Sequence, residues 1–199
     1  MSRLLVTVPL AFLAAGAALI AMLRPADAAT AGAPVAAVTR AVPAFARARI
    51  QTDRVPRAIA RRTATRLLLS SSRRIASRAG RLVFVAPSAD GKLVCLVSLS
   101  PTGEVGTACS PPSTFTGRAG FAVLVGDRGP GTGPTSVVAA ANARVRTLVL
   151  VFEGSSRRVH PNVDGGVAYV PAASGGRLVS ISSVDASGQT IGTLRVPAG

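Results

Sequence analysis

The chain has 199 residues, is 48% hydrophobic and contains 20 Gly and 14 Pro, which suffices for one domain with a turn-rich buried core and extensions. Its two cysteines and single histidine are too few for a zinc-type metal site. The formal net charge of +15 is unevenly distributed, because twelve arginines and one acid, Asp53, lie in residues 40–81. We therefore expect a strongly basic arm joined to a nearly balanced domain.

The first 28 residues have the composition of an export signal. Arg3 precedes the uncharged run of residues 4–23, and Ala26-Asp27-Ala28 then forms an A-x-A site ahead of Ala29. This pattern predicts a signal peptide cleaved between Ala28 and Ala29. The same run is also long enough for a retained membrane anchor. In that case Arg24 and the arginines after it favour a cytoplasmic C-terminal portion.

We expect export, with the protein either secreted or anchored to the outer face of the cytoplasmic membrane. Residues 29–42 follow as a predicted flexible linker, because this stretch is rich in Ala, Thr, Gly and Pro and shows no hydrophobic periodicity. Residues 43–80 form the basic arm, which we expect to be partly helical. Within it, residues 57–79 place most of their apolar side chains on one side of a helical wheel, and Gly80 suits a helix end.

Arginines of this arm are the expected contacts with an anionic surface: Arg57, Arg61, Arg62, Arg66, Arg73 and Arg74. A guanidinium group can bind phosphate or carboxylate oxygens with two parallel hydrogen bonds. For an exported chain we expect anionic lipid or an acidic cell-envelope polymer as the partner. Nucleic acid is the expected partner only if the arm faces the cytoplasm. The alternative is that these arginines form nothing more than a solvated face.

From residue 81 to 199, short apolar runs alternate with turns. The expected strands are residues 82–86, 93–99, 104–109, 121–125, 136–140, 144–152, 157–160, 167–170, 178–184 and 190–196. Asp90-Gly91 predicts a tight hairpin turn. Residues 144–152 are apolar on both faces and predict a central strand. The pattern indicates a mainly β fold: a small antiparallel β-sandwich or barrel-like domain, preceded by the basic helical arm and an N-terminal signal or anchor helix.

Several segments together resemble a group of bacterial proteins. They are Ser72-Arg73-Arg74-Ile75-Ala76, Leu82-Val83-Phe84-Val85-Ala86-Pro87, Val94-Cys95-Leu96-Val97 with the later Cys109, and Val184-Asp185-Ala186-Ser187-Gly188-Gln189-Thr190-Ile191-Gly192. From Phe45 to its end, the chain is similar to uncharacterised exported or membrane-anchored proteins of high-GC actinobacteria. The resemblance implies an exported or anchored protein, and it transfers no activity and no catalytic residue.

Cys95 and Cys109 are the only cysteines, and an even count in an exported chain predicts a disulfide. Both lie in or beside consecutive expected strands, which could meet as neighbours in a hairpin. The bond would close a loop of about fifteen residues, worth about 3 kcal/mol in the chain-entropy treatment. Two unpaired buried thiols are the alternative.

The sequence contains no recognisable catalytic signature. His160 could serve a triad with Asp164 and a serine, but no G-x-S-x-G elbow presents that serine, so we expect an ordinary loop or strand-end histidine. The glycine-rich residues 126–134 lack the lysine of a phosphate loop. We therefore expect no catalytic, cofactor-binding or metal-ligating residue and no cofactor.

These features favour a non-enzymatic exported protein that acts at the cell envelope as an interaction or structural module. One alternative is a secreted hydrolase whose active site, built on carboxylates or His160, is not evident from the sequence. The other is a basic nucleic-acid-binding protein, which would require the chain to stay inside the cell.

Overall fold

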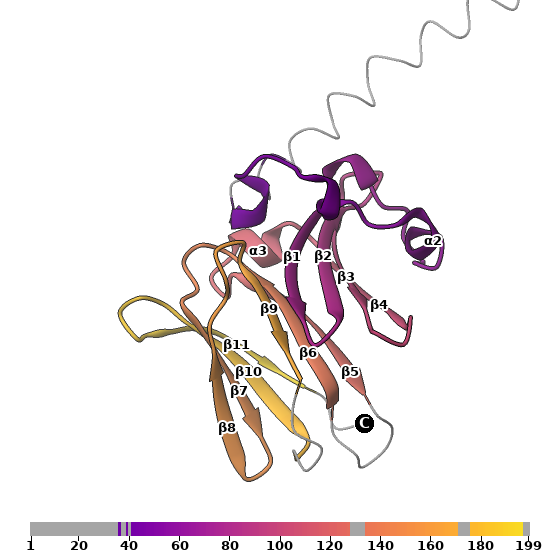
Figure 1. Cartoon of the computed structure of the whole chain (residues 1–199). Helices are drawn as coiled ribbons and strands as arrows, with labels where there is room; N and C mark the ends of the chain where they lie inside the picture. The colour runs from indigo at the N-terminus through magenta and orange to yellow at the C-terminus, as the bar shows by residue number, and fades with distance from the viewer. Residues whose placement is uncertain (1–35, 37–38, 40, 128–133, 171–175, 197–199) are drawn as a thin grey trace, which may run out of the picture.

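The computed structural model describes residues 36, 39, 41–127, 134–170 and 176–196. These residues form eleven strands in three antiparallel sheets and a few short helical turns (Figure 1), so the mainly β prediction is confirmed. The predicted signal or anchor, residues 1–28, and most of the predicted linker lie outside the described residues. Of the helices in the described part, none is both long and apolar enough to cross a membrane.

The first sheet is a four-stranded meander. It consists of β1 (Arg73–Arg78), β2 (Arg81–Pro87), β3 (Val94–Leu99) and β4 (Val105–Ser110), in that spatial order. The turn between β2 and β3 contains Gly91 with a φ of 69°, as the Asp90-Gly91 pair predicts. Cys95 and Cys109 lie directly opposite each other on β3 and β4 and form a disulfide, which confirms the predicted pairing.

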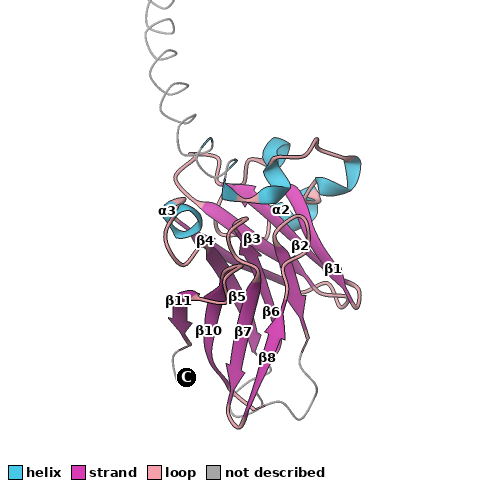
Figure 2. Cartoon of the chain, turned by 90° about the vertical axis from the view of Figure 1, so that its left-hand side faces the viewer, coloured by secondary structure: helices cyan, strands magenta, loops and turns pink. Residues whose placement is uncertain are grey.

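Two further sheets follow along the chain (Figure 2). The short α3 (Ser113–Thr116) leads into the middle sheet, in which β5 (Phe121–Asp127), β6 (Pro134–Ala141) and β9 (Gly166–Tyr169) have the order β5-β6-β9. The third sheet contains β7 (Thr147–Phe152), β8 (Ser155–Val159), β10 (Leu178–Val184) and β11 (Thr190–Arg195), in the order β11-β10-β7-β8. The predicted central strand is therefore confirmed, because β7 lies between β10 and β8.

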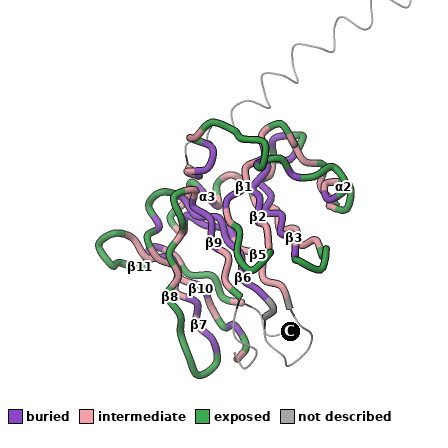
Figure 3. Tube along the Cα trace, viewed as in Figure 1, coloured by how far each residue is buried: buried purple, intermediate pink, exposed green. Residues whose placement is uncertain are grey.

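The sheets are stacked around three clusters of buried side chains. Figure 3 shows the backbone positions of the buried residues in purple, many of them on inner strands such as β2, β3 and β6. Val83 and Leu96 of the first sheet pack against Val138 of the middle sheet. The opposite face of the middle sheet, with Val137, packs against Leu150 of the third sheet. Residues 137–141 of β6 are therefore at most 1% exposed, because both faces of this strand are covered.

The third cluster lies on the outer face of the first sheet, where the basic arm covers it. Val55 and Ile59 from the arm pack against Phe84 of β2 and Val97 of β3. Backbone hydrogen bonds support this contact, because the Leu68 N–H donates to the Pro87 carbonyl and the Ala89 N–H donates to the Arg66 carbonyl. Residues 55–69 of the arm are thus packed along the outer face of this sheet, whereas the end of the arm forms its first strand, β1.

The structure corrects the helix predicted for residues 57–79. The α-helical part is only α2 (Arg57–Ala60), η3 (Leu69–Ser71) is a single 3-10 turn, and Arg73–Arg78 is strand β1. The reason is that the apolar residues which share one side of a helical wheel belong to two different cores. Leu67 packs on the outer face of the first sheet, whereas Ile75 points into the core beneath it.

Candidate functional site

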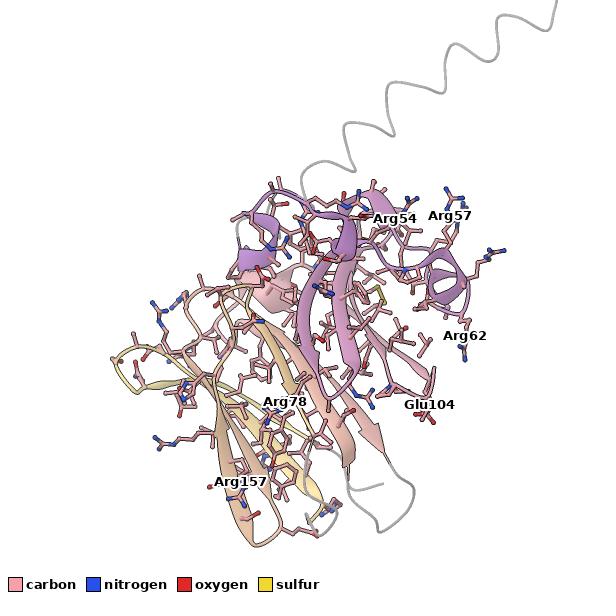
Figure 4. All side chains as sticks on the ribbon, in the orientation of Figure 1. Arg54, Arg57, Arg62, Arg78, Glu104 and Arg157 are labelled. Carbon is pink, nitrogen blue, oxygen red and sulfur yellow. A yellow bond between two sulfur atoms is a disulfide. The ribbon has the colours of Figure 1, made fainter. Side chains whose placement is uncertain are left out.

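Five exposed arginines surround α2, and we name them the α2 arginine surface: Arg54, Arg57, Arg61, Arg62 and Arg66. Four of the six arginines predicted to contact an anionic surface belong to it. Figure 4 shows Arg54, Arg57 and Arg62 extending outward from this end of the molecule. Within the described residues these five side chains form no ion pair; Arg62 Nη1 donates to the Gly103 carbonyl at 2.9 Å.

The local fold explains why these side chains point to solvent. Pro56 precedes α2, and Ile59 is 8% exposed because it packs with Val55 on the first sheet. A helix of four residues that buries Ile59 directs Arg57 and Ala58 outward, whereas Ala60 is half-buried against the same cluster. Arg57 and Arg61 are four residues apart and therefore lie on the same side of the turn. The buried anchors thus fix where the charges of the surface lie.

Asp53, the single acid of the arm, is buried beneath the surface. Its side chain has 0% exposure, and its carboxylate accepts hydrogen bonds from Arg47 Nη1 at 2.6 Å and Arg47 Nη2 at 2.8 Å. The backbone N–H groups of Ile50 and Arg74 also donate to it, at 2.8 and 3.0 Å. Burial favours the neutral acid, but the bonds from Arg47 and the backbone hold the pKa of Asp53 well below its usual value.

Arg47 links its own segment, which contains Asp53, to strand β1 and to the segment after β8. Besides binding Asp53, it donates from Nε to Asp164 Oδ1 at 2.8 Å and from Nη2 to the Arg74 carbonyl at 3.0 Å. The hydrogen bonds to Asp53 and then Asp164 raise the pKa of Arg47 above its usual value. Because the acids of this network are engaged by Arg47, they do not neutralise the α2 arginine surface.

Arg73 and Arg74, the other two predicted contacts, are half-buried on β1 at the junction with the arm. The Arg73 guanidinium lies 5.7 Å from the centroid of the Phe45 ring, and Nη1 donates to the Ser72 carbonyl at 3.0 Å. Burial lowers the pKa of Arg73, and its Nε atom has no hydrogen-bond partner among the described residues. These two arginines therefore do not belong to the α2 arginine surface.

His160 follows β8 directly, which is the strand-end position expected from the sequence. Its Nδ1 atom lies 3.1 Å from the Arg146 carbonyl and 3.2 Å from Thr147 Oγ1. Asp164 binds Arg47 instead of this imidazole. The hypothetical triad of His160 and Asp164 is therefore not assembled.

Two features of the site were missed by sequence reasoning. Arg54 belongs to the α2 arginine surface, and only its charge and its position before Pro56 could have indicated this. The link between Arg47 and Asp164 spans 117 residues and has no local signal. The predicted cleavage site at Ala28 and Ala29 lies outside the described residues.

In the described ranges, His, Cys, Asp and Glu side chains do not gather in groups of three or more that could hold a metal ion. The glycine-rich stretch 126–134 is described only at its two ends. Comparisons of the chain with protein-family models, curated proteins and solved structures find no match.

Proposed function

We propose that the protein is an exported, non-enzymatic module that binds anionic surfaces of the cell envelope through the α2 arginine surface. The observation that carries this proposal is the separation of charge within the arm. Five arginines are exposed around α2, while Asp53 is buried against Arg47. The Cys95–Cys109 disulfide supports export, since such bonds persist mainly in oxidising compartments.

The mechanism is electrostatic and is aided by a fixed scaffold. Each arginine near an anionic lipid surface contributes about 1 kcal/mol, and guanidinium groups can also form paired hydrogen bonds with phosphate. Because Val55 and Ile59 hold the arm on the first sheet, the backbone that carries these arginines is already ordered before binding. The attraction falls with ionic strength, since the Debye length is about 8 Å at 0.15 M salt.

Sedimentation with lipid vesicles tests the electrostatic role. We expect the full-length chain to bind phosphatidylglycerol vesicles more tightly than phosphatidylcholine vesicles. The double variant Arg57→Gln/Arg61→Gln is expected to weaken binding to the anionic vesicles by about tenfold or more, because two cationic contacts are lost. The comparison between the two lipids separates this effect from insertion of the N-terminal apolar run.

The matched control removes the same charge from the third sheet, with Arg157→Gln/Arg195→Gln at two exposed positions. This variant is expected to bind anionic vesicles within about twofold of the parent chain, since its arginines lie outside the α2 arginine surface. An equal loss of vesicle binding in both double variants would show that binding depends only on the net charge of the protein. That result would contradict binding through a localised surface.

Intact mass and N-terminal sequencing of native protein test export. From separated membrane and culture fractions, we expect a chain that begins at Ala29 and is lighter by two hydrogens before reduction than after it. A full-length chain in the membrane with free thiols would contradict export and would make nucleic acid and acidic cytosolic partners the first ones to test.

A further inference from the structure

A cleft of about 410 Å³ lies where edges of the three sheets come together. One wall is formed by residues 76–78 of β1, the edge strand of the first sheet. Residues 166–168 of β9, the edge of the middle sheet, form a second wall. Residues 158–160, at the end of the edge strand β8, complete the lining with Asn162.

Asn162 and Gly166 hold β1 and β9 together beside this cleft. Asn162 Nδ2 donates to the Ile75 carbonyl at 2.7 Å, and its Oδ1 accepts from the Gly166 N–H at 2.9 Å. A Cβ atom on Gly166 would lie only 2.1 Å from the Ile75 oxygen, so this approach of the two strands requires glycine. The walls of the cleft are therefore held by the Asn162 side chain and by the close approach of Gly166 to Ile75.

The strand edges that line the cleft offer backbone hydrogen-bonding groups. Within the described residues, β1 pairs only with β2, and β9 pairs only with β6. Each of the two strands thus has a second edge whose N–H and C=O groups pair with no other strand, and of these groups the Ile75 carbonyl and the N–H and C=O of Gly166 are bonded to Asn162. Such groups can orient a bound molecule, as they do in many small-molecule sites.

The side chains that line the cleft are cationic or neutral. Arg78 and Arg158 are exposed, and within the described structure neither side chain forms a hydrogen bond or an ion pair. The Ser77 hydroxyl and the His160 imidazole add further polar groups, and the lining contains no acidic residue. Two arginines whose donors are unengaged, in a cleft without a carboxylate, select for a ligand of negative charge.

We propose that this cleft binds a small organic anion. Its carboxylate or phosphate group contacts Arg78 and Arg158, and its apolar part lies against Val167 and Ala168 of β9. The volume lies within the range of about 300–1,000 Å³ that is usual for small-molecule sites. The inference goes beyond the proposed function, because Figure 4 shows Arg78 at a distance from Arg54, Arg57 and Arg62.

Isothermal titration calorimetry on the full-length chain tests this inference, with succinate and inorganic phosphate as anionic probes and succinamide as the neutral analogue of succinate. We expect at least one anion to bind and succinamide not to bind. Arg78→Gln and Arg158→Gln are each expected to weaken anion binding by about tenfold or more, since each removes charge-assisted hydrogen bonds. Tighter binding of succinate or of phosphate identifies the preferred head group.

The control is Arg195→Gln, which removes one charge from an exposed position of β11 outside the cleft lining and is expected to leave anion binding unchanged. The inference is overturned if neither anion binds at concentrations on the order of 10 mM. It is also overturned if binding survives both cleft variants, or if the control weakens binding as much as they do. The Arg78→Gln variant is expected to bind anionic vesicles as tightly as the parent chain does. Vesicle sedimentation with this variant therefore distinguishes a failure of this inference from a failure of the proposed function.

Discussion

Replacing Asp53 by asparagine is expected to lower the free energy of unfolding by about 3–5 kcal/mol. Asparagine has nearly the volume of aspartate, but it lacks the charge that pairs with Arg47 in a position of 0% exposure. Its amide group would also place donor hydrogens against the N–H group of Ile50 or Arg74, each of which now donates to a carboxylate oxygen. Both losses occur where solvent cannot compensate for them.

Chemical denaturation of the parent chain and the Asp53→Asn variant measures this difference. Glu153→Gln is the matched control, because it removes one carboxylate from an exposed ion pair in which Glu153 Oε1 lies 3.0 Å from Arg177 Nε. Exposed pairs contribute little, so this variant is expected to lose less than about 1 kcal/mol. Equal losses in the two variants would show that the Asp53 network does not hold the arm on the sheet.

The pH dependence of stability provides a second measure of the same network. The pKa of Asp53 is lower in the folded protein than its usual value of 3.8, so the unfolded chain takes up this proton first as the pH falls. The stabilisation is complete well above pH 3.8 and is lost as the pH falls from there toward the folded pKa. In Asp53→Asn this contribution should be absent, and the stability of the variant should vary less with pH in that range.

The strands were predictable because their signals are local. Each of the ten expected strands has a counterpart from β2 to β11, since short apolar runs between glycines and prolines indicate strands independently of the neighbouring sheets. For β1 the local signal was ambiguous: Arg73–Arg78 contains one large apolar residue, Ile75, and follows three serines. Pairing with β2 decides its conformation, and that contact is not visible in the residues themselves.

The candidate site was only partly predictable for the same physical reason. Charge density alone identified the arm and four of the five arginines in the α2 arginine surface. The engagement of Asp53 and Asp164 by Arg47, by contrast, depends on how the arm folds back onto β1 and the segment after β8. The cleft beside Arg78 depends on three strands from three sheets, so its parts have no common pattern along the chain.

Reduction of the Cys95–Cys109 disulfide is expected to lower the free energy of unfolding by about 3 kcal/mol. The two cysteines are 14 residues apart in sequence, so the bond removes conformations mainly from the unfolded chain. The folded sheet also gives the bond a local role. Within the described residues β4 is an edge strand, and all its residues are only half-buried, so it has less apolar packing than β2 or β3.

We therefore expect reduction to act first on β4. Amide hydrogens of Val105–Ser110 should exchange faster in the reduced chain, while those of β7, the central strand of the third sheet, should change only with global stability. The arm near Thr65 should also loosen, because Cys109 Sγ lies 3.6 Å from Thr65 Oγ1. The measurement is hydrogen exchange with and without dithiothreitol, together with denaturant unfolding under both conditions.

The matched control is the double variant Cys95→Ala/Cys109→Ala, whose stability should be lower than that of the oxidised parent and insensitive to dithiothreitol. The decisive comparison is between the oxidised parent chain and the reduced parent chain, whose reduction is verified by a mass increase of two hydrogens. If its unfolding curve is unchanged, the pairing of β4 with β3 is sufficient to hold this edge, and the cross-link contributes no stability. If its curve moves toward that of the double variant, the disulfide is what makes a half-buried edge strand a stable part of the sheet that supports the α2 arginine surface.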